Sequence, residues 1–269
     1  MSPDTPNLLE RLQRLNAIGV ALSAERDTER LMERILESAR ELTYADGGTI
    51  YLRTGDDHLK FEIMLTESLG IRLGGTSGEP ISFPPLPLYD EQGRPNHNMV
   101  APYAAVAGVT VNIEDAYTAE AFDFSGTRAF DARTGYRSRS FLTVPMVNHE
   151  GTVIGVLQLI NARRPADGEV VPFSGEDQHL VESLSSQAAV ALTNQRLLDD
   201  QRQLFEAFIE LIAGAIDDKS PYTGGHCRRV PELTMMLADA AAGVSEGPLA
   251  GFTMSEDDRY ELKIAGWLH

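Results

Sequence analysis

The chain has 269 residues, which is long for one compact domain and sufficient for one domain and part of another. Apolar residues make up 42% of it and charged residues 23%, which is ordinary for a globular protein. The formal net charge of −17 argues against a general nucleic-acid binder, because binding of a polyanion requires basic surface. This charge does not exclude the binding of a small nucleotide in a local pocket.

Three features of the sequence favour a cytoplasmic protein. No window reaches the roughly 18 apolar residues that a membrane-spanning helix needs, and residues 1–15 lack the apolar core of a signal peptide. The single cysteine, Cys227, excludes an intrachain disulfide, which fits a reducing compartment. We therefore expect a cytoplasmic chain that contacts no membrane.

The apolar spacing in the first half of the chain predicts helices followed by strands. The expected elements are helices at 8–22 and 27–44, strands at 47–54 and 58–65, a loop at 74–98, a short helix at 99–108 and a strand at 109–113. Asp27 or Thr28 can cap the second helix, and Gly55-Asp56-Asp57 is typical of a hairpin turn between the two strands.

The second half begins with the strongest strand signal and continues as one long helix. SFLTVPMVN and TVIGVLQLIN flank HEG, which predicts a β-hairpin over 140–161. A helix is expected from Ser174, a suitable N-cap, to about Asp217. The order of elements predicts an α+β sensor module joined to a downstream element.

The long helix carries a heptad pattern. Apolar residues alternate in steps of three and four over about four repeats, at Ala188, Ala191, Gln195, Leu198, Arg202, Phe205, Ile209, Ile212 and Ile216. The polar residues Gln195 and Arg202 would weaken a coiled coil and help to fix its register. The pattern predicts a parallel dimer, although a helix packed on its own domain would show a similar stripe.

The order of NIEDAY, TGYRSRSFL, VP, GVLQLIN and FxxxD resembles a GAF domain, of the type found in cyclic-nucleotide phosphodiesterases and bacterial signalling proteins. The resemblance covers residues 16–197. It implies an α+β fold with a six-stranded antiparallel sheet, flanking helices on one face and a small-molecule pocket on the other.

Cyclic-nucleotide-binding members of that family carry a scattered signature of Asn, Lys, Phe, Asp and Glu. Asn161, Phe173 and Asp177 match it, whereas the Lys and Glu positions hold other residues. In the family this set is a structural support near the pocket. The resemblance therefore leaves three alternatives: a cyclic nucleotide, another small ligand, or a relay and dimerisation module without a ligand.

Polar groups between residues 100 and 140 are candidates for contacts to a purine edge and a phosphate. They are Asn112, Asp115, Thr134, Arg137 and Arg139, with one of the last two arginines as the anion partner. Alternatively, NIEDAY is a loop whose Asp caps a turn. No pair of a nucleophile and a base stands out, so we expect no chemistry in this domain.

The stretch SPYTGGHCRRV, residues 220–230, follows the long helix. Ser220 precedes a proline, so the long helix should end near Lys219 and a new helix should begin close to His226. The stretch resembles the opening of an HD-GYP domain, the bacterial branch of the HD metal-dependent phosphohydrolases. SEDDRYELKIAGWLH, residues 255–269, has the character of that domain's second helix.

The HD-GYP resemblance implies metal-dependent hydrolysis of cyclic-di-GMP. In the complete domain, divalent iron or manganese ions activate a water for attack on the phosphodiester. By the resemblance His226 and His269 correspond to metal-binding histidines and Asp217 to an additional ligand. The Asp that should follow His269 and the later ligands do not occur in the sequence, so we expect this segment to be inactive by itself and to hold no certain metal.

We therefore predict four segments: an N-terminal helix at 1–15, a GAF sensor at 16–197, a coiled-coil signalling helix at 198–216 and the first part of an HD-GYP domain at 217–269. The predicted function is bacterial signal transduction, in which a dimeric GAF sensor controls a cyclic-di-GMP phosphodiesterase. The alternative is a non-catalytic GAF module that binds a ligand and dimerises. A transcriptional regulator is disfavoured because no helix-turn-helix with a basic face is visible.

Overall fold

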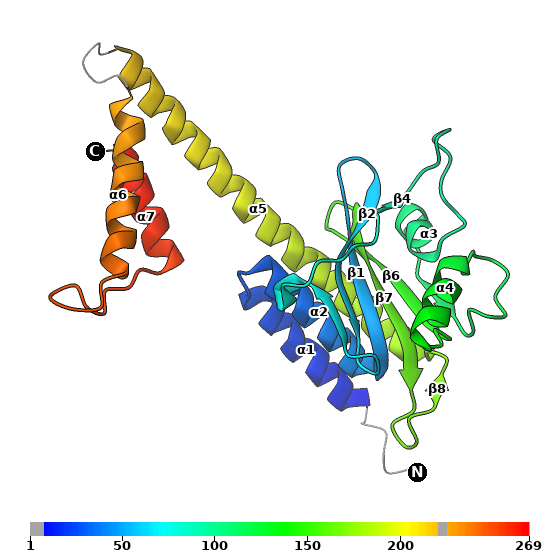
Figure 1. Ribbon diagram of the computed structural model, residues 1–269. Coiled ribbons are helices and arrows are strands. Elements are labelled where there is room, and N and C mark those ends of the chain that lie inside the picture. The colour runs from blue at the N-terminus through cyan, green and yellow to red at the C-terminus, as the bar shows by residue number, and fades with distance from the viewer. Residues whose placement is uncertain (1–7, 220–224, 269) are drawn as a thin grey trace. The chain divides into compact units, whose positions relative to one another are not determined.

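The computed structural model describes residues 8–219 and 225–268 (Figure 1). The chain divides into two compact units, residues 1–195 and 196–269. The division lies close to the boundary expected at residue 197. No helix among the described residues is long and apolar enough to cross a lipid bilayer.

The first unit combines helices with a β-sheet. Its helices are α1 (Leu8–Ala24), α2 (Thr28–Thr43), the short 3₁₀ helix η1 (Gly75–Ser77), α3 (Val100–Ala107), α4 (Ser125–Thr134) and the beginning of α5 (Gly175–Lys219). Its strands are β1 (Ala45–Arg53), β2 (His58–Thr66), β3 (Ile71–Gly74), β4 (Leu86–Pro87), β5 (Val111–Ile113), β6 (Phe141–Val147), β7 (Val153–Arg163) and β8 (Val170–Val171). Helix α1 runs through residue 15, where the sequence suggested a boundary.

The sheet is antiparallel and has the order β3-β2-β1-β7-β6-β5, with β4 beside β2 and β8 beside β7. Both expected hairpins, β1–β2 and β6–β7, are present. The pairing of β1 with β7 joins the two hairpins, with Ile50 opposite Leu157. The six main strands agree with the sheet that the GAF resemblance implied.

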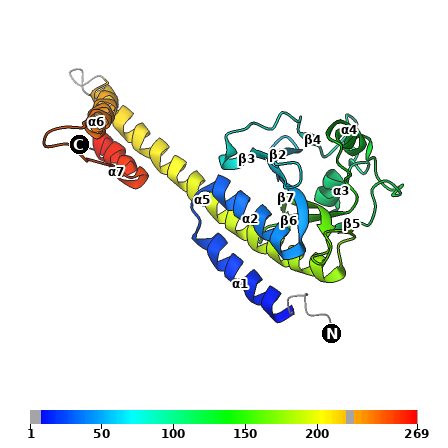
Figure 2. The same ribbon diagram turned by 60° about the horizontal axis from the view of Figure 1, so that its bottom comes forward.

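Helices α1, α2 and the beginning of α5 cover one face of the sheet (Figures 1 and 2). Alternate strand residues such as Ile50, Leu157 and Leu159 are fully buried against these helices, as the two-residue period of a strand requires. Asp27 caps α2 by accepting a hydrogen bond of 2.9 Å from the backbone N–H of Arg30. This face contains the larger apolar core.

The other face of the sheet is covered by α3 and α4 (Figures 1 and 2). Two smaller apolar clusters form there, one around Tyr51 and Ala101 and one around Phe124 and Phe141. The helix α3 agrees with the expectation for 99–108, whereas α4 was not predicted.

Helix α5 begins at the residue expected from the sequence. The backbone N–H of Asp177 donates to the hydroxyl of Ser174 at 3.1 Å, and the N–H of Ser174 donates back to the Asp177 carboxylate at 3.0 Å. This reciprocal pair satisfies two backbone donors at the helix start. Arg11 of α1 forms an ion pair with the same carboxylate and so joins the two helices.

The second unit contains the end of α5 together with α6 (His226–Ala242) and α7 (Glu256–Leu268). The ion pair of Lys263 with Glu206, at 2.8 Å, joins α7 to α5. Gly266 allows α7 to approach α6, because a Cβ at this position would lie 2.9 Å from the Cα of Pro231. The helix start expected near His226 is confirmed, and residues 220–224 and His269 lie outside the described residues.

The expected heptad positions of α5 are divided between core and surface. Ala188 is buried in the first unit and Ile209 in the second, whereas Leu198 and Phe205 are exposed. A second stripe with the same seven-residue spacing is exposed along its whole length, at Val190, Leu197, Leu204 and Leu211. The apolar surface that α5 offers to a partner therefore includes this stripe together with the seam positions Leu198, Phe205, Ile212 and Ile216.

Candidate ligand-binding site

A cavity of about 430 Å³ lies in the first unit, between the sheet and the segments that cover it. It is the hollow that best fits a small-molecule site, because a largely apolar lining surrounds a few convergent polar groups. Larger hollows of about 590 and 670 Å³ differ in character. The first is a mostly apolar groove between α5 and α7, and the second is lined by charged side chains, many of them already in ion pairs.

Aromatic side chains dominate the cavity lining. They are Tyr51, Phe61, Phe83, Phe124, Phe130, Tyr136 and Phe141. Some are packed against each other, with ring centroids 4.7 Å apart for Tyr51 and Phe61 and 5.5 Å apart for Phe124 and Phe141. Such a lining suits a flat ring, which can stack on the faces and edges of the surrounding rings.

The sheet side of the cavity carries a buried polar network in an otherwise apolar surface. Thr49, Gln158 and Thr143 lie opposite one another on β1, β7 and β6. The hydroxyl of Tyr51 donates to Oε1 of Gln158 at 3.2 Å, and Nε2 of Gln158 donates to the hydroxyl of Thr143 at 3.0 Å. Burial raises the pKa of Tyr51, so its hydroxyl keeps its proton and remains a donor at neutral pH.

Two buried carboxylates hold the covering segment, which consists of α4 and the residues up to Ser138 that follow it. Asp131 of α4 accepts hydrogen bonds from the hydroxyl of Tyr117 at 2.7 Å and from the backbone N–H of Ser138 at 2.8 Å. Asp46, at the start of β1, accepts a hydrogen bond of 2.6 Å from the hydroxyl of the cavity residue Tyr136. The covering segment is thus connected to the sheet through Tyr136.

The environment of Asp46 keeps it ionised. Burial opposes its negative charge, but hydrogen bonds from Ser68 and Tyr136 and the nearby guanidinium of Arg163 together lower its pKa. The Arg163 guanidinium lies 2.9 Å from the carboxylate. The pKa of Tyr136 is raised by burial and by its hydrogen bond to Asp46, so the tyrosine stays neutral.

Of the described side chains that line the cavity, two are charged. Asp123 precedes α4 and accepts a hydrogen bond of 2.8 Å from the backbone N–H of Ser125. Arg133 lies in the last turn of α4, and its guanidinium forms no ion pair with the described residues. Arg133 is therefore the cation that the cavity offers to an anionic ligand.

The five polar residues predicted to contact a ligand do not line this cavity. Asn112 donates to the backbone carbonyl of Phe173 at 3.2 Å, and the hydroxyl of Thr134 donates to the carbonyl of Phe130 at 2.9 Å. Local backbone groups thus satisfy both side chains.

The charged members of that set pair with each other or with a ring. Asp115 lies 3.3 Å from Arg139, and its carboxylate caps the turn that follows, as the alternative interpretation of NIEDAY proposed. The guanidinium of Arg137 lies 4.4 Å from the centre of the Tyr117 ring. The structure brings these residues together beside the covering segment and outside the cavity.

The three signature residues support local structure and do not line the cavity. Oδ1 of Asn161 accepts the backbone N–H of Arg139 at 2.7 Å, and its Nδ2 donates to the carbonyl of Arg137 at 2.8 Å. Phe173 is buried in the main core, and Asp177 caps α5. The three side chains thus contact the backbone, the main core and the start of α5, respectively.

The polar network on the cavity side of the sheet left a signal in the sequence. Thr49, Thr143 and Gln158 are polar residues within strands whose neighbouring residues are buried in the main core. Since successive side chains of a strand point to opposite faces, these three must face the other side of the sheet. Arg133 and Tyr136 left no such signal, because α4 was not predicted.

In the second unit, the described residues contain no group of three His, Cys, Asp or Glu side chains that would suit a metal ion. Asp217 is buried and accepts the backbone N–H of Cys227 at 3.3 Å, while its second oxygen has no hydrogen-bond partner among the described residues. His226 is the exposed first residue of α6. The third predicted ligand, His269, lies outside the described residues.

Proteins named as cyclic-nucleotide phosphodiesterases are similar to this chain in sequence. The dual 3′,5′-cyclic-AMP and -GMP phosphodiesterase 11A of Takifugu rubripes is 30% identical over 121 residues, which cover 44% of this chain and 12% of the relative. The dual phosphodiesterase 11 of Drosophila melanogaster is 29% identical over 179 residues, covering 65% and 11%. The matches thus span only about a tenth of the length of these relatives.

Solved structures share the fold of the first unit. The GAF domain of a phosphoenolpyruvate-protein phosphotransferase from Coxiella burnetii is similar with a TM-score of 0.53 and 15% identity, covering 72% of this chain and 99% of that one. The free methionine-R-sulfoxide reductase of Neisseria meningitidis gives a TM-score of 0.51 at 16% identity, covering 74% and 97%. The sequence model of the GAF domain matches residues 27–192, more than half of the chain. The chain belongs to the GAF domain family.

Proposed function

We propose that the cavity binds a cyclic mononucleotide and that the chain is the sensor part of a signalling protein. The observation that carries the proposal is a cavity rich in aromatic rings, with a polar network on the sheet and, at α4, the Arg133 guanidinium, which forms no ion pair with the described residues. The similarity to phosphodiesterases named for cyclic AMP and cyclic GMP supports the same class of ligand.

In this proposal the base lies against the sheet and the phosphate meets Arg133. Arg137 and Arg139, the anion partners expected from the sequence, are already engaged with Tyr117 and Asp115. A free guanidinium at the cavity gives a charge-assisted hydrogen bond without first breaking an ion pair. We therefore assign the phosphate contact to Arg133.

Titration calorimetry of the full chain with cyclic AMP and cyclic GMP tests the ligand. Arg133→Gln should weaken binding roughly ten- to a hundredfold, because a hydrogen bond to a charged group contributes about 1.5–3 kcal/mol. Arg137→Gln is the matched control, since it removes the same charge outside the cavity. Absence of binding in the wild type refutes the ligand, and equal losses in both variants refute the assignment to Arg133.

We further propose that residues 217–269 begin an HD-GYP-type output domain for cyclic-di-GMP. The buried carboxylate of Asp217 close to the start of α6, with an oxygen free of other described partners, supports this proposal. Asp217, His226 and His269 would be ligands of the iron or manganese ions, which supply an activated water in the complete domain.

We expect the 269 residues by themselves not to hydrolyse cyclic-di-GMP, because the described residues contain no group of three His, Cys, Asp or Glu side chains that would suit a metal ion. Chromatography after incubation with manganese or iron should detect no linear dinucleotide. Turnover that disappears in His226→Ala would contradict this expectation. The alternative, a GAF module that binds its ligand without catalysis, predicts no turnover for any longer form of the chain.

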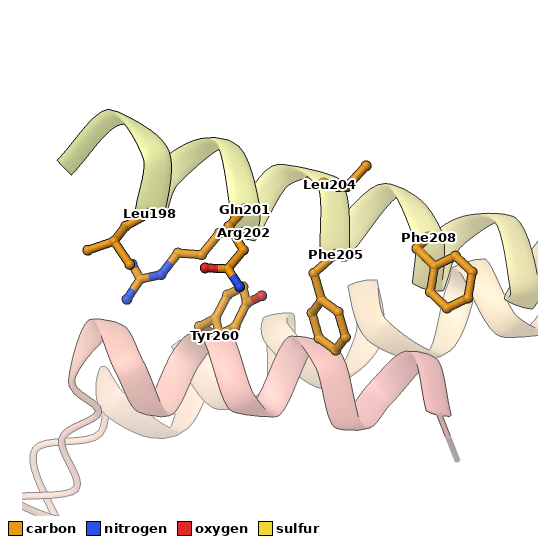
Figure 3. A pocket seen from close by; sticks show the side chains of 7 residues that line it. All are labelled: Leu198, Gln201, Arg202, Leu204, Phe205, Phe208 and Tyr260. Carbon is orange, nitrogen blue, oxygen red and sulfur yellow. The ribbon is translucent and has the colours of Figure 1, made fainter. Parts of the chain in front are cut away.

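We propose a homodimer through the exposed stripe of α5, defined by Val190, Leu197, Leu204 and Leu211. The seven-residue spacing of the stripe supports a parallel pairing of two helices. On the end of α5, Leu198 and Phe205 lie on the side that faces Tyr260 of α7, whereas Leu204 points away (Figure 3). Leu204 is 72% exposed and therefore accessible to a second copy.

A further inference from the structure

The polar network on the sheet has unused hydrogen-bonding capacity. The side-chain amide of Gln158 has two donor positions on Nε2 and two acceptor positions on Oε1. Thr143 takes one donor position and Tyr51 takes one acceptor position. One donor and one acceptor of Gln158 therefore remain, and the side chain lines the cavity.

The network also fixes the orientation of this amide. Tyr51 keeps its proton, so it donates to the oxygen of Gln158 and favours the amide orientation in which that oxygen faces the tyrosine. The hydroxyl of Thr143 accepts from the nitrogen on the neighbouring strand. Thr143 is fully buried and Gln158 is 8% exposed, so water competes little for these groups. Hydrogen bonds in such surroundings are stronger than in water.

Resting on the proposed function, we infer that Gln158 recognises the substituted edge of a purine base and thereby selects the ligand. The amide matches a ring edge on which a donor and an acceptor are adjacent, such as the 6-amino group with N1 of adenine, or N1–H with the 6-oxo group of guanine. The aromatic rings around the cavity hold the plane of such a base.

This arrangement disfavours the binding of a ligand whose ring edge lacks an adjacent donor and acceptor. A ring with hydrogen at position 6 would displace water from the free amide groups of Gln158 and replace only part of their hydrogen bonds. Unpaired buried polar groups carry a large penalty, which is the physical origin of selectivity against such analogues. Gln158 keeps its hydrogen bonds to Tyr51 and Thr143, so only its remaining donor and acceptor lose their partners. We therefore expect such an analogue to bind about ten- to a hundredfold more weakly than the natural nucleotide.

Calorimetry with matched ligand pairs tests the inference on the full chain. Cyclic AMP and cyclic GMP are each compared with the cyclic monophosphate of purine riboside. This analogue has hydrogen at positions 2 and 6 and so presents no adjacent donor and acceptor. The wild type should bind the natural nucleotide at least tenfold more tightly than its analogue, whereas Gln158→Met should bind both members of a pair with similar affinity.

Thr143→Val and Thr143→Ser provide a second comparison that leaves Gln158 in place. Valine removes the hydroxyl that holds the amide and should reduce the discrimination between pair members, while serine keeps the hydroxyl and should preserve it. Thermal denaturation checks that each variant is folded.

The outcomes separate the inference from the proposed function. Absence of binding of all three ligands to the wild type overturns both. Binding of a nucleotide and its analogue with equal affinity in the wild type overturns the inference alone, and so does discrimination that persists in Gln158→Met.

Discussion

Asn161 illustrates how a single residue shapes the site without lining the cavity. Its backbone is left-handed, with φ of 57°, a conformation that asparagine tolerates better than most residues. Its side chain bonds to the backbone of residues 137–140, which lead from Tyr136 into β6. The signature position thus fixes the chain between the covering helix and the sheet.

Two substitutions of Asn161 separate the contribution of its side-chain hydrogen bonds from that of its left-handed backbone. Asn161→Gly keeps the left-handed backbone favourable and removes the side-chain hydrogen bonds, so it should lower the free energy of unfolding by about 2–4 kcal/mol. Asn161→Ala should lower it by about 1 kcal/mol more, because alanine disfavours this backbone conformation. Urea denaturation measures both values, and a glycine variant as stable as the wild type would contradict the account.

Asp46 predicts a dependence of stability on pH. Its pKa is lower in the folded chain than its ordinary value of 3.8, so its stabilisation is fully present above that value. The stabilisation is lost as the pH falls below 3.8 toward the folded pKa. The difference in free energy of unfolding between wild type and Asp46→Asn should therefore be largest at neutral pH and should narrow at pH 3. An equal or wider difference at pH 3 would contradict this prediction.

At the scale of secondary-structure elements, the sequence predicted the helices and hairpins whose signal lies in a few neighbouring residues. The 3.6-residue period of α2 and the caps at Asp27 and Ser174 are visible in a few neighbouring residues, and both helices begin where expected. The β6–β7 hairpin is equally local. The six-stranded antiparallel sheet came from the GAF resemblance, and the structure agrees with it.

Helix α4 shows why much of the site could not be predicted. Asp131 is its buried residue, a charged side chain held by Tyr117 and Ser138, so no apolar stripe marks the helix. The polar residues chosen from the same region are satisfied by one another and by the backbone. Composition identified a polar segment, but only tertiary packing determines which of its side chains reach the cavity.

The α5 helix gives a prediction about assembly. Leu204→Asp places a charge on the exposed stripe and should convert the dimer into a monomer at tens of micromolar, as measured by light scattering. Gln203→Asp adds the same charge one residue away, at an exposed position outside the stripe, and should leave the dimer intact. A dimeric Leu204→Asp variant, or a monomeric wild type, would contradict the proposed pairing.

At the scale of the whole molecule, we propose that the cavity of the first unit senses a ligand and that the segment beginning near Asp217 belongs to an output domain. The first unit has the complete sheet, both helical covers and the matched family region, residues 27–192. Helix α5 contributes residues to both units. The cavity, α4 and the sheet all belong to the unit in which α5 begins. A ligand that changed the position of α4 or of the sheet would therefore act within that unit.

The most direct test of the central claim is calorimetry on a variant whose cavity is filled. Ala129 of α4 lines the cavity, so the indole of Ala129→Trp should occupy the space of the base. Ala132→Trp adds the same side chain to an exposed position of the same helix outside the cavity. We predict that cyclic AMP or cyclic GMP binds the wild type and Ala132→Trp with similar affinity and does not bind Ala129→Trp. Binding of equal affinity in all three proteins, or binding in none, would contradict the claim.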